Sequence, residues 1–154
     1  MSGGRFDFRE LKQLQKQLEQ LEKDKDKFCE VCARYLAARL LAKVIKRTPS
    51  DTGNLRRGWT AQGSGSGSEG LKTRGASQYV DTLKVNHYGD TYVVEIINPV
   101  EYATYVEYGH RTASHKGWVP GRFMLTISER ELEQQAPKMI EKRISDYLKG
   151  VFRV

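Results

Sequence analysis

The sequence lacks a long hydrophobic run and has few of the residues that build covalent or metal cross-links. Its 154 residues include no stretch of about 18 consecutive apolar side chains, so we expect no membrane-spanning helix. The opening MSGGRFDFRELKQ has no apolar signal-peptide core, which predicts synthesis in the cytoplasm. Two cysteines cannot form a disulfide framework, and a chain of this length can bury a core without one.

Candidate catalytic and metal-binding groups are equally scarce. Cys29 and Cys32 lie three apart, a spacing that suits two core thiols on one helical face or half of a zinc site, but no second ligand pair follows. His87, His110 and His115 match no metal-ligand template. The sequence has no GxSxG elbow, no phosphate-binding Gly-Lys-Ser/Thr loop and no carboxylate cluster for magnesium. We therefore expect no cofactor, no metal and no enzymatic activity.

Positive charge is concentrated in the first part of the chain. The net charge is +7, and residues 1–59 contain 14 Lys and Arg against 8 Asp and Glu, which leaves +6 in this segment. Such an excess attracts double-stranded DNA without reading its sequence, or acidic protein surfaces. A solvated helix face explains the excess equally well. A basic DNA-binding module is the alternative function that this pattern supports.

Two helical segments are expected before residue 48. Residues 8–21 place an apolar residue every three or four positions, a narrow stripe that suits pairing with another helix. The alternating charges of 23–27 indicate either a hinge or a solvated turn of one longer helix. Residues 26–47 give the strongest helix signal, and their polar residues change sides halfway along. That change predicts two packing partners, of which one could be another subunit.

The middle of the chain predicts a turn, a flexible loop and a hairpin. Pro49, Asp51, Thr52 and Gly53 form a structural turn, in which Asp51 caps the backbone and Gly53 takes a positive φ. Leu55 to Ala61 is expected to begin a strand with Trp59 as a buried anchor. Residues 62–78 form a flexible Gly/Ser-rich loop. Strands at 79–87 and 91–98 join through a turn at 88–90.

The last third predicts a short helix, a loop and a final helix. Residues 100–108 are helical, with Tyr102 and Val106 in the core and Gly109 at the helix end. A loop over 109–122 leads to a helical region at about 123–149, where Pro137 predicts a kink or restart. Together the elements predict a single α+β domain over 1–154. An antiparallel hairpin or meander sheet packs against a long N-terminal and a C-terminal helix.

Aromatic residues with an arginine nearby suggest a candidate subunit interface. It comprises Tyr105, Tyr108, His110, Arg111 and Trp118. Aromatic side chains and arginine are enriched at the centres of protein–protein interfaces. The same set could also stack on nucleic-acid bases.

Two segments in this order resemble a known family: Thr48-Pro-Ser-Asp-Thr-Gly-Asn-Leu-Arg56 and Tyr102-Ala-Thr-Tyr-Val-Glu-Tyr-Gly109. With Pro120-Gly-Arg-Phe-Met-Leu125 before a C-terminal helix, the chain is similar to the tail-component family of Hong Kong-type lambdoid phages, over about residues 7–148. In this chain His110 precedes Arg111, where members of that family commonly continue with Thr-Arg after the glycine.

The resemblance implies a structural virion protein, made in the host bacterial cytoplasm. It implies a neck, connector or tail-completion subunit at the head–tail junction. A subunit of this kind would form a homo-oligomer, with a ring around the DNA channel as the expected form. Its partners would be copies of itself, neighbouring neck, portal-side and tail proteins, and passing double-stranded DNA, but no membrane. A tail terminator that caps the tail tube is the alternative within this class.

Overall fold

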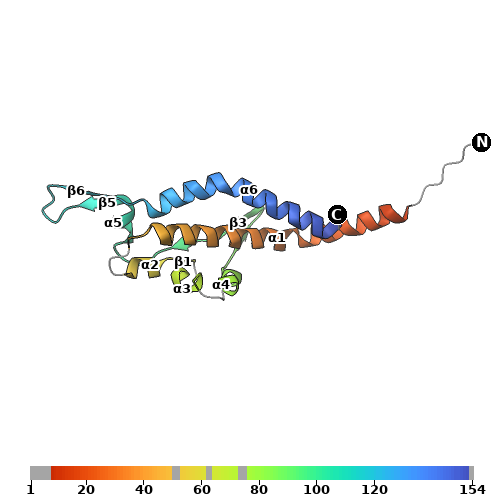
Figure 1. Cartoon of the computed structure of the whole chain (residues 1–154), viewed down its shortest axis with the longest axis horizontal. Coiled ribbons are helices and arrows are strands. Elements are labelled where there is room, and N and C mark those ends of the chain that lie inside the picture. Colours follow the sequence, from red (N-terminus) through yellow and green to blue (C-terminus); the bar gives the residue numbers. More distant parts are fainter. Residues whose placement is uncertain (1–7, 50–52, 62–63, 73–75, 153–154) are drawn as a thin grey trace, which may run out of the picture.

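Two long antiparallel helices form the body of an elongated molecule (Figure 1). The computed structural model describes residues 8–49, 53–61, 64–72 and 76–152. Helix α1 spans Arg9–Arg47 and helix α6 spans Met124–Phe152. The Gln17 side-chain amide donates to the carbonyl of Val151 at one end, and Arg47 pairs with Glu131 at the other, so the helices run in opposite directions.

The run of alternating charges at 23–27 lies inside α1 and forms no hinge. With 39 residues against 29, α1 extends past the C-terminal end of α6 (Figure 1). Helix α6 is unbroken at Pro137, so of the two predicted alternatives, a kink or a restart, the restart does not occur. Its axis changes direction near the middle, as expected when a proline removes a backbone donor (Figure 1).

Short elements connect the two long helices. In chain order they are α2 (Asn54–Gly58), β1 (Thr60–Ala61), α3 (Gly67–Gly70), α4 (Ala76–Thr82), β2 (Asn86–Tyr88), β3 (Thr91–Val93), β4 (Ile96–Ile97), α5 (Ala103–Tyr108), β5 (Gly109–Arg111) and β6 (Trp118–Pro120). The strands form three antiparallel pairs, β1–β4, β2–β3 and β5–β6. The predicted α+β class, with small antiparallel sheets beside two long helices, is confirmed.

Two predicted strands are partly helical. Most of the strand expected to begin within 55–61 is helical, because residues 54–58 form α2. In that predicted segment, Thr60 and Ala61 form the strand β1. Helix α4 occupies the start of the predicted strand at 79–87, because Tyr79, Val80 and Leu83 all pack on one side against Ala37 and Ala61. Their spacing fits a helical turn better than alternation does. The turn at 88–90 joins β2 and β3 as predicted.

The two segments predicted to be loops, 62–78 and 109–122, contain regular structure. Residues 109–122 form the β5–β6 hairpin where a loop was expected. The described part of the 62–78 segment includes α3, and Gly67 and Ser68 are buried there. The Gly67 amide donates to the carbonyl of Trp59, and a Cβ at Gly67 would meet Ile45 and Leu41 of α1. Small residues therefore allow α3 to approach α1 closely.

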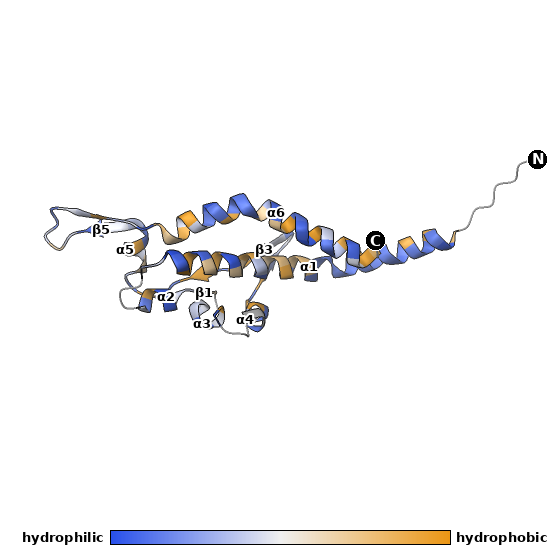
Figure 2. Cartoon of the chain, in the orientation of Figure 1, coloured by the Kyte–Doolittle hydropathy of each residue, from blue (hydrophilic) through white to orange (hydrophobic). Residues whose placement is uncertain are grey.

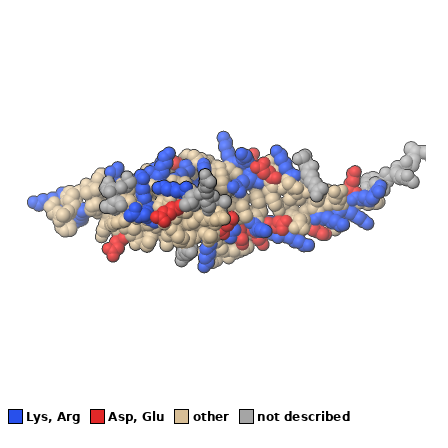
Figure 3. Space-filling model, turned by 60° about the horizontal axis from the view of Figure 1, so that its bottom comes forward, with Lys and Arg blue, Asp and Glu red and all other residues tan. Residues whose placement is uncertain are grey.

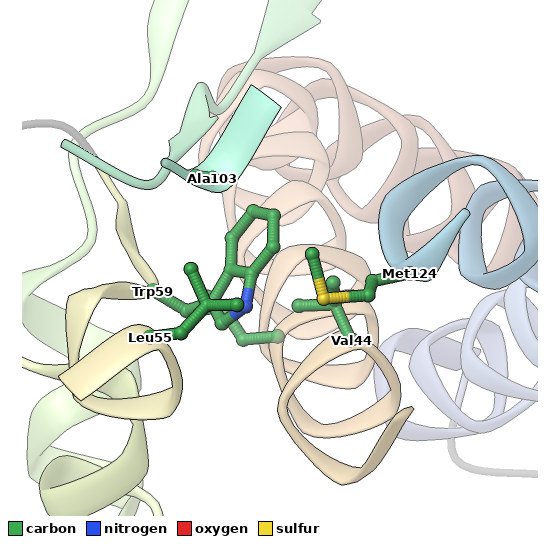
Figure 4. Close-up of a cluster of buried hydrophobic side chains, with 6 residues drawn as sticks. Val44, Leu55, Trp59, Ala103 and Met124 are labelled. Atoms are coloured by element: carbon green, nitrogen blue, oxygen red, sulfur yellow. The ribbon is translucent and has the colours of Figure 1, made fainter. Parts of the chain in front are cut away.

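The main core lies where α1, α2, α5 and α6 meet (Figure 4). Its buried residues are Leu41, Val44, Leu55, Trp59, Ala103 and Met124. The Trp59 ring lies between the helices, with Leu55 on one side and Val44 and Met124 on the other (Figure 4). Trp59 is the buried anchor that the sequence predicts. The two packing partners predicted for α1 both lie within this chain, since α6 packs along one side and α3 and α4 along another.

Candidate assembly interface

The five predicted interface residues lie together on α5 and the β5–β6 hairpin, at the end of the molecule opposite the N-terminal part of α1 (Figure 1). Tyr105, Tyr108 and Trp118 are 59%, 60% and 60% exposed, which is unusual for rings of this size. Arg111 is also exposed, and His110 is half-buried. We call this surface, together with Phe123, the aromatic end.

The strand register of the hairpin sorts these side chains onto two faces. His110 pairs with Val119, and Arg111 pairs with Trp118. Directly opposite residues in an antiparallel pair project to the same side, so Arg111 and Trp118 share one face and His110 and Val119 share the other. The Tyr105 ring lies 5.7 Å from the His110 ring, on the latter face. Both faces of the hairpin thus present aromatic rings.

Phe123 and Tyr108 extend the aromatic end toward α6. Their ring centroids lie 6.4 Å apart in an edge-on arrangement, and Phe123 is 40% exposed. Phe123 has a φ of 48°, a left-handed conformation that costs energy in a bulky residue. Such strain is found most often at functional sites. Two hydrogen bonds hold Phe123 in this conformation: the Phe123 amide donates to the carbonyl of Glu107, and the Ile127 amide donates to the carbonyl of Phe123.

Buried Glu107 fixes the aromatic end to the start of α6. Its carboxylate accepts hydrogen bonds from the backbone amides of Leu125 at 3.0 Å and Thr126 at 2.9 Å, and from the Thr126 hydroxyl at 2.8 Å. A carboxylate here satisfies free amides of the first helical turn and matches the positive end of the helix dipole. The sequence analysis missed this role, although Glu107 stands almost alone among apolar and aromatic neighbours.

The base of the hairpin requires glycine at two positions. Gly109 ends α5 with a φ of 88°, as its predicted place at the helix end suggests. A Cβ at Gly109 would lie 2.5 Å from the carbonyl oxygen of Val119, and one at Gly121 would lie 2.4 Å from that of Glu107. Backbone atoms cannot yield at such distances. Gly109 and Gly121 therefore set how the aromatic end joins the body.

The predicted turn after α1 is described in part. Gly53 has the predicted positive φ, at 74°. Pro49 follows the helix end, whereas Asp51 and Thr52 lie outside the described residues.

Thr48 has a role that the sequence analysis missed. Its buried hydroxyl donates to the carbonyl of Val44 and accepts a 2.8 Å hydrogen bond from the indole of Trp59, joining the helix end to the core.

A second exposed surface lies on the N-terminal part of α1, which projects past the end of α6. We call it the N-terminal stripe; it comprises Phe8, Leu11, Leu14 and Leu18, all of which are exposed. Figure 2 shows hydrophobic residues continuing along α1 into this projecting part. The aromatic end and the N-terminal stripe thus lie at opposite ends of the molecule (Figure 1).

A third surface is a basic groove beside the C-terminal half of α1. Two adjoining hollows of about 470 and 480 Å³ share Ala42 and Lys46 in their walls. The positive side chains that line them are Arg39, Lys43, Lys46, Arg47, Arg56, Arg57 and Lys72. Among the described lining residues, Glu131 of α6 is the one carboxylate, and hydrogen bonds from Arg47 and then Lys43 lower its pKa.

The remaining candidate residues, Cys29, Cys32 and His87, lie on α1 and β2. Cys29 is partly buried and Cys32 is buried in α1, both as free thiols, and burial raises the pKa of Cys32. His87 lies exposed on β2, stacked on Tyr92. Within the described ranges, no group of three or more His, Cys, Asp or Glu side chains is placed to hold a metal ion. Of the helices that the structure describes, none has the length and apolar character to cross a membrane.

These features define an elongated α+β protein with exposed aromatic and apolar surfaces at its two ends. Over residues 12–109 the sequence matches the family model described as "Bacteriophage HK97-gp10, putative tail-component", and the chain belongs to this family. The match includes the Thr48–Arg56 and Tyr102–Gly109 segments and ends at Gly109, the first residue of the β5–β6 hairpin, before α6. No curated protein and no solved structure matches the chain. The protein is a structural component of a bacteriophage tail, and hence of the virion.

Proposed function

We propose that the protein is a non-enzymatic subunit of the head–tail junction, a neck, connector or tail-completion protein that assembles as a ring of identical copies around the DNA channel. The aromatic end is the observation that supports this proposal most strongly. Tyr105, Tyr108 and Trp118 expose more than half of their area on a surface whose helix α5 is joined to α6 by the hydrogen bonds of Glu107. Large aromatic rings on a preformed surface provide contact area at little entropic cost, which is typical of interface hot spots.

The positions of the exposed surfaces support a subunit that joins different neighbours. The aromatic end and the N-terminal stripe differ in composition and lie at opposite ends of the long axis (Figure 1). A self-complementary two-fold dimer would use one patch on both copies, whereas a subunit within a ring or a stacked assembly needs two different surfaces. An elongated subunit with distinct ends meets that requirement. The tail terminator shares this requirement and is the alternative within the class.

Complementation of a phage that lacks this gene tests the proposal. Trp118→Ser removes an exposed ring from the aromatic end, and Tyr88→Ser removes one from the β2–β3 hairpin, where Tyr88 is 66% exposed. We expect Trp118→Ser to lower infectious titre at least about tenfold, because each hot-spot ring contributes about 2 kcal/mol or more to assembly. Tyr88→Ser should complement like the wild-type chain.

Immunoblots of purified particles complete the test. The wild-type chain should be present in virions and Trp118→Ser depleted from them, while both chains accumulate equally in infected cells. Absence of the wild-type chain from intact particles would refute the virion role. Equal incorporation of Trp118→Ser and wild type would refute the role of the aromatic end while leaving the family assignment intact.

A further inference from the structure

The basic groove differs from the rest of α1 in how its charges are arranged. In the first half of α1 acidic residues are interspersed with basic ones, most regularly in 23–27. In the C-terminal half, Arg39, Lys43 and Lys46 recur at helical spacing on one face. Like charges three or four residues apart destabilise a helix. Glu131 of α6 neutralises part of this repulsion by pairing with Lys43, and an anionic partner would reduce the rest.

The groove gathers cations from three parts of the fold. Arg39 to Arg47 belong to α1, Arg56 and Arg57 to α2, and Lys72 follows α3. Among the described residues, its lining holds seven positive side chains and one carboxylate, an excess of six in a chain of net charge +7. Figure 3 shows Lys and Arg side chains grouped on this face, in the half nearer the hairpin. A local excess of this size attracts a polyanion.

Several of these cations are held in place and still keep free donors. Arg56 donates through Nε to the carbonyl of Thr48 at 2.7 Å, and Arg57 donates to the Asn54 side chain at 2.6 Å. Lys43 and Arg47 share the Glu131 carboxylate. Each arginine guanidinium has five N–H donors, so these bonds leave others available. The groove is thus partly preorganised for several anionic groups at once.

The composition of the groove favours nucleic acid over an acidic protein segment. The described residues that line it include no aromatic side chain, and its apolar members are Ala42, Ile45 and Leu71. A protein partner is normally anchored by aromatic or large apolar residues in a pocket, and this chain has such residues at its aromatic end. Binding to a phosphate backbone needs cations and open access, which the groove offers.

We propose that the basic groove binds the phosphate backbone of double-stranded DNA without reading its sequence. The cations of α1 lie along one helix face over about 12 Å, a length that spans more than one phosphate on a strand. The cations of α2 and Lys72 form the opposite wall. This inference goes beyond the proposed function, because an isolated chain can bind DNA through this groove whether or not it forms a ring.

Fluorescence anisotropy with a labelled duplex of about 30 base pairs tests the inference on the full-length protein. The groove variant is Arg39→Gln/Lys46→Gln/Lys72→Gln, three exposed residues whose side chains take no part in the hydrogen bonds just described. The control is Lys12→Gln/Lys25→Gln/Lys138→Gln, three exposed residues outside the groove. Both variants lower the net charge by three, so a general charge effect acts equally on both.

We expect wild type to bind at about 50 mM salt with an affinity that falls steeply as salt rises. The groove variant should bind at least about tenfold more weakly, with a log–log salt slope shallower by about two to three, since each phosphate contact contributes about 0.9. The control should stay within about threefold of wild type. Circular dichroism and light scattering on the same samples report folding and oligomeric state, so a failed ring proposal is distinguishable from a failed DNA proposal.

Three results would overturn the inference. The first is no duplex binding by the wild-type chain at about 50 mM salt. The second is an equal loss of affinity in the groove and control variants. In the third, polyglutamate of matched charge displaces the duplex at lower concentration than unlabelled duplex does, which would assign the groove to an acidic protein partner.

Discussion

Replacing Glu107 with glutamine tests whether this side chain joins the aromatic end to α6. One carboxylate oxygen accepts from the amide and hydroxyl of Thr126, and the other accepts from the amide of Leu125. The substituted glutamine can keep its oxygen toward Thr126, but its NH₂ group must then face the Leu125 amide, donor against donor. Losing that bond and leaving its donor unpaired costs about 2 kcal/mol, and loss of the charge at the helix N-terminus adds about 0.5 kcal/mol.

The expected loss of about 2.5 kcal/mol corresponds to a Tm decrease of roughly 5–10 °C for a chain of this size. Thermal melts followed by circular dichroism at neutral pH measure it. Glu101→Gln is the matched control, because Glu101 is exposed just before α5 and the substitution changes the charge equally. A decrease in Tm no larger for Glu107→Gln than for Glu101→Gln would show that the reasoning about Glu107 is wrong.

Three further predictions concern the turn after α1 and the contact between α1 and α6. Thr48→Val leaves the buried indole N–H of Trp59 unpaired and should lower the free energy of unfolding in urea by about 1–3 kcal/mol, with a smaller loss for Thr48→Ser, which keeps the hydroxyl. Gly53→Val places a β-branched residue at a φ of 74° and should cost about 2 kcal/mol in the same assay, whereas Gly65→Val, at a position with open space, should change it by less than about 0.5 kcal/mol. The hydrogen bonds that lower the pKa of Glu131 stabilise the fold at pH values above 4.5, the ordinary pKa of this carboxyl, and this stabilisation is lost as pH falls through the lowered pKa. The Tm difference between wild type and Glu131→Gln should therefore be largest near neutral pH and shrink in acid.

Elements with a strong local signal were predictable from the sequence. The helix at 26–47 has no Gly or Pro and many Ala and Leu, and it forms as part of α1. Trp59 is buried, and Gly53 and Gly109 take positive φ as turn and helix-end residues do. The exposed aromatic residues before and after Arg111 lie at one end of the molecule, on both faces of the β5–β6 hairpin. In each case one or two neighbouring residues determine the conformation.

Features that depend on contacts between distant residues were not predictable. The alternation in 79–87 suggests a strand, but packing of Leu83 against Ala37, 46 positions earlier in the chain, favours a helical turn there. Tyr102 was expected in the core and is 41% exposed, whereas Val106 packs against the core as expected. The role of Glu107 depends on where α6 begins. The residues next to Glu107 in the sequence do not indicate where that helix starts.

The same limit applies to the basic groove. The sequence shows the charge excess before residue 60 and the change of polar side along α1, but Lys72 and Arg57 join the groove only after α2 and α3 fold against α1. Local periodicity can assign a residue to one face of a helix. It cannot indicate which other elements will form the opposite wall.

A cryo-electron microscopy map of the intact head–tail junction, from the phage that encodes this chain, tests the central claim most directly. We predict a closed ring of copies in which Tyr105 and Trp118 are buried against the next copy or an adjoining neck or tail protein. A map whose neck and tail density is fully accounted for by other proteins would contradict the account, as would a ring in which the aromatic end faces solvent.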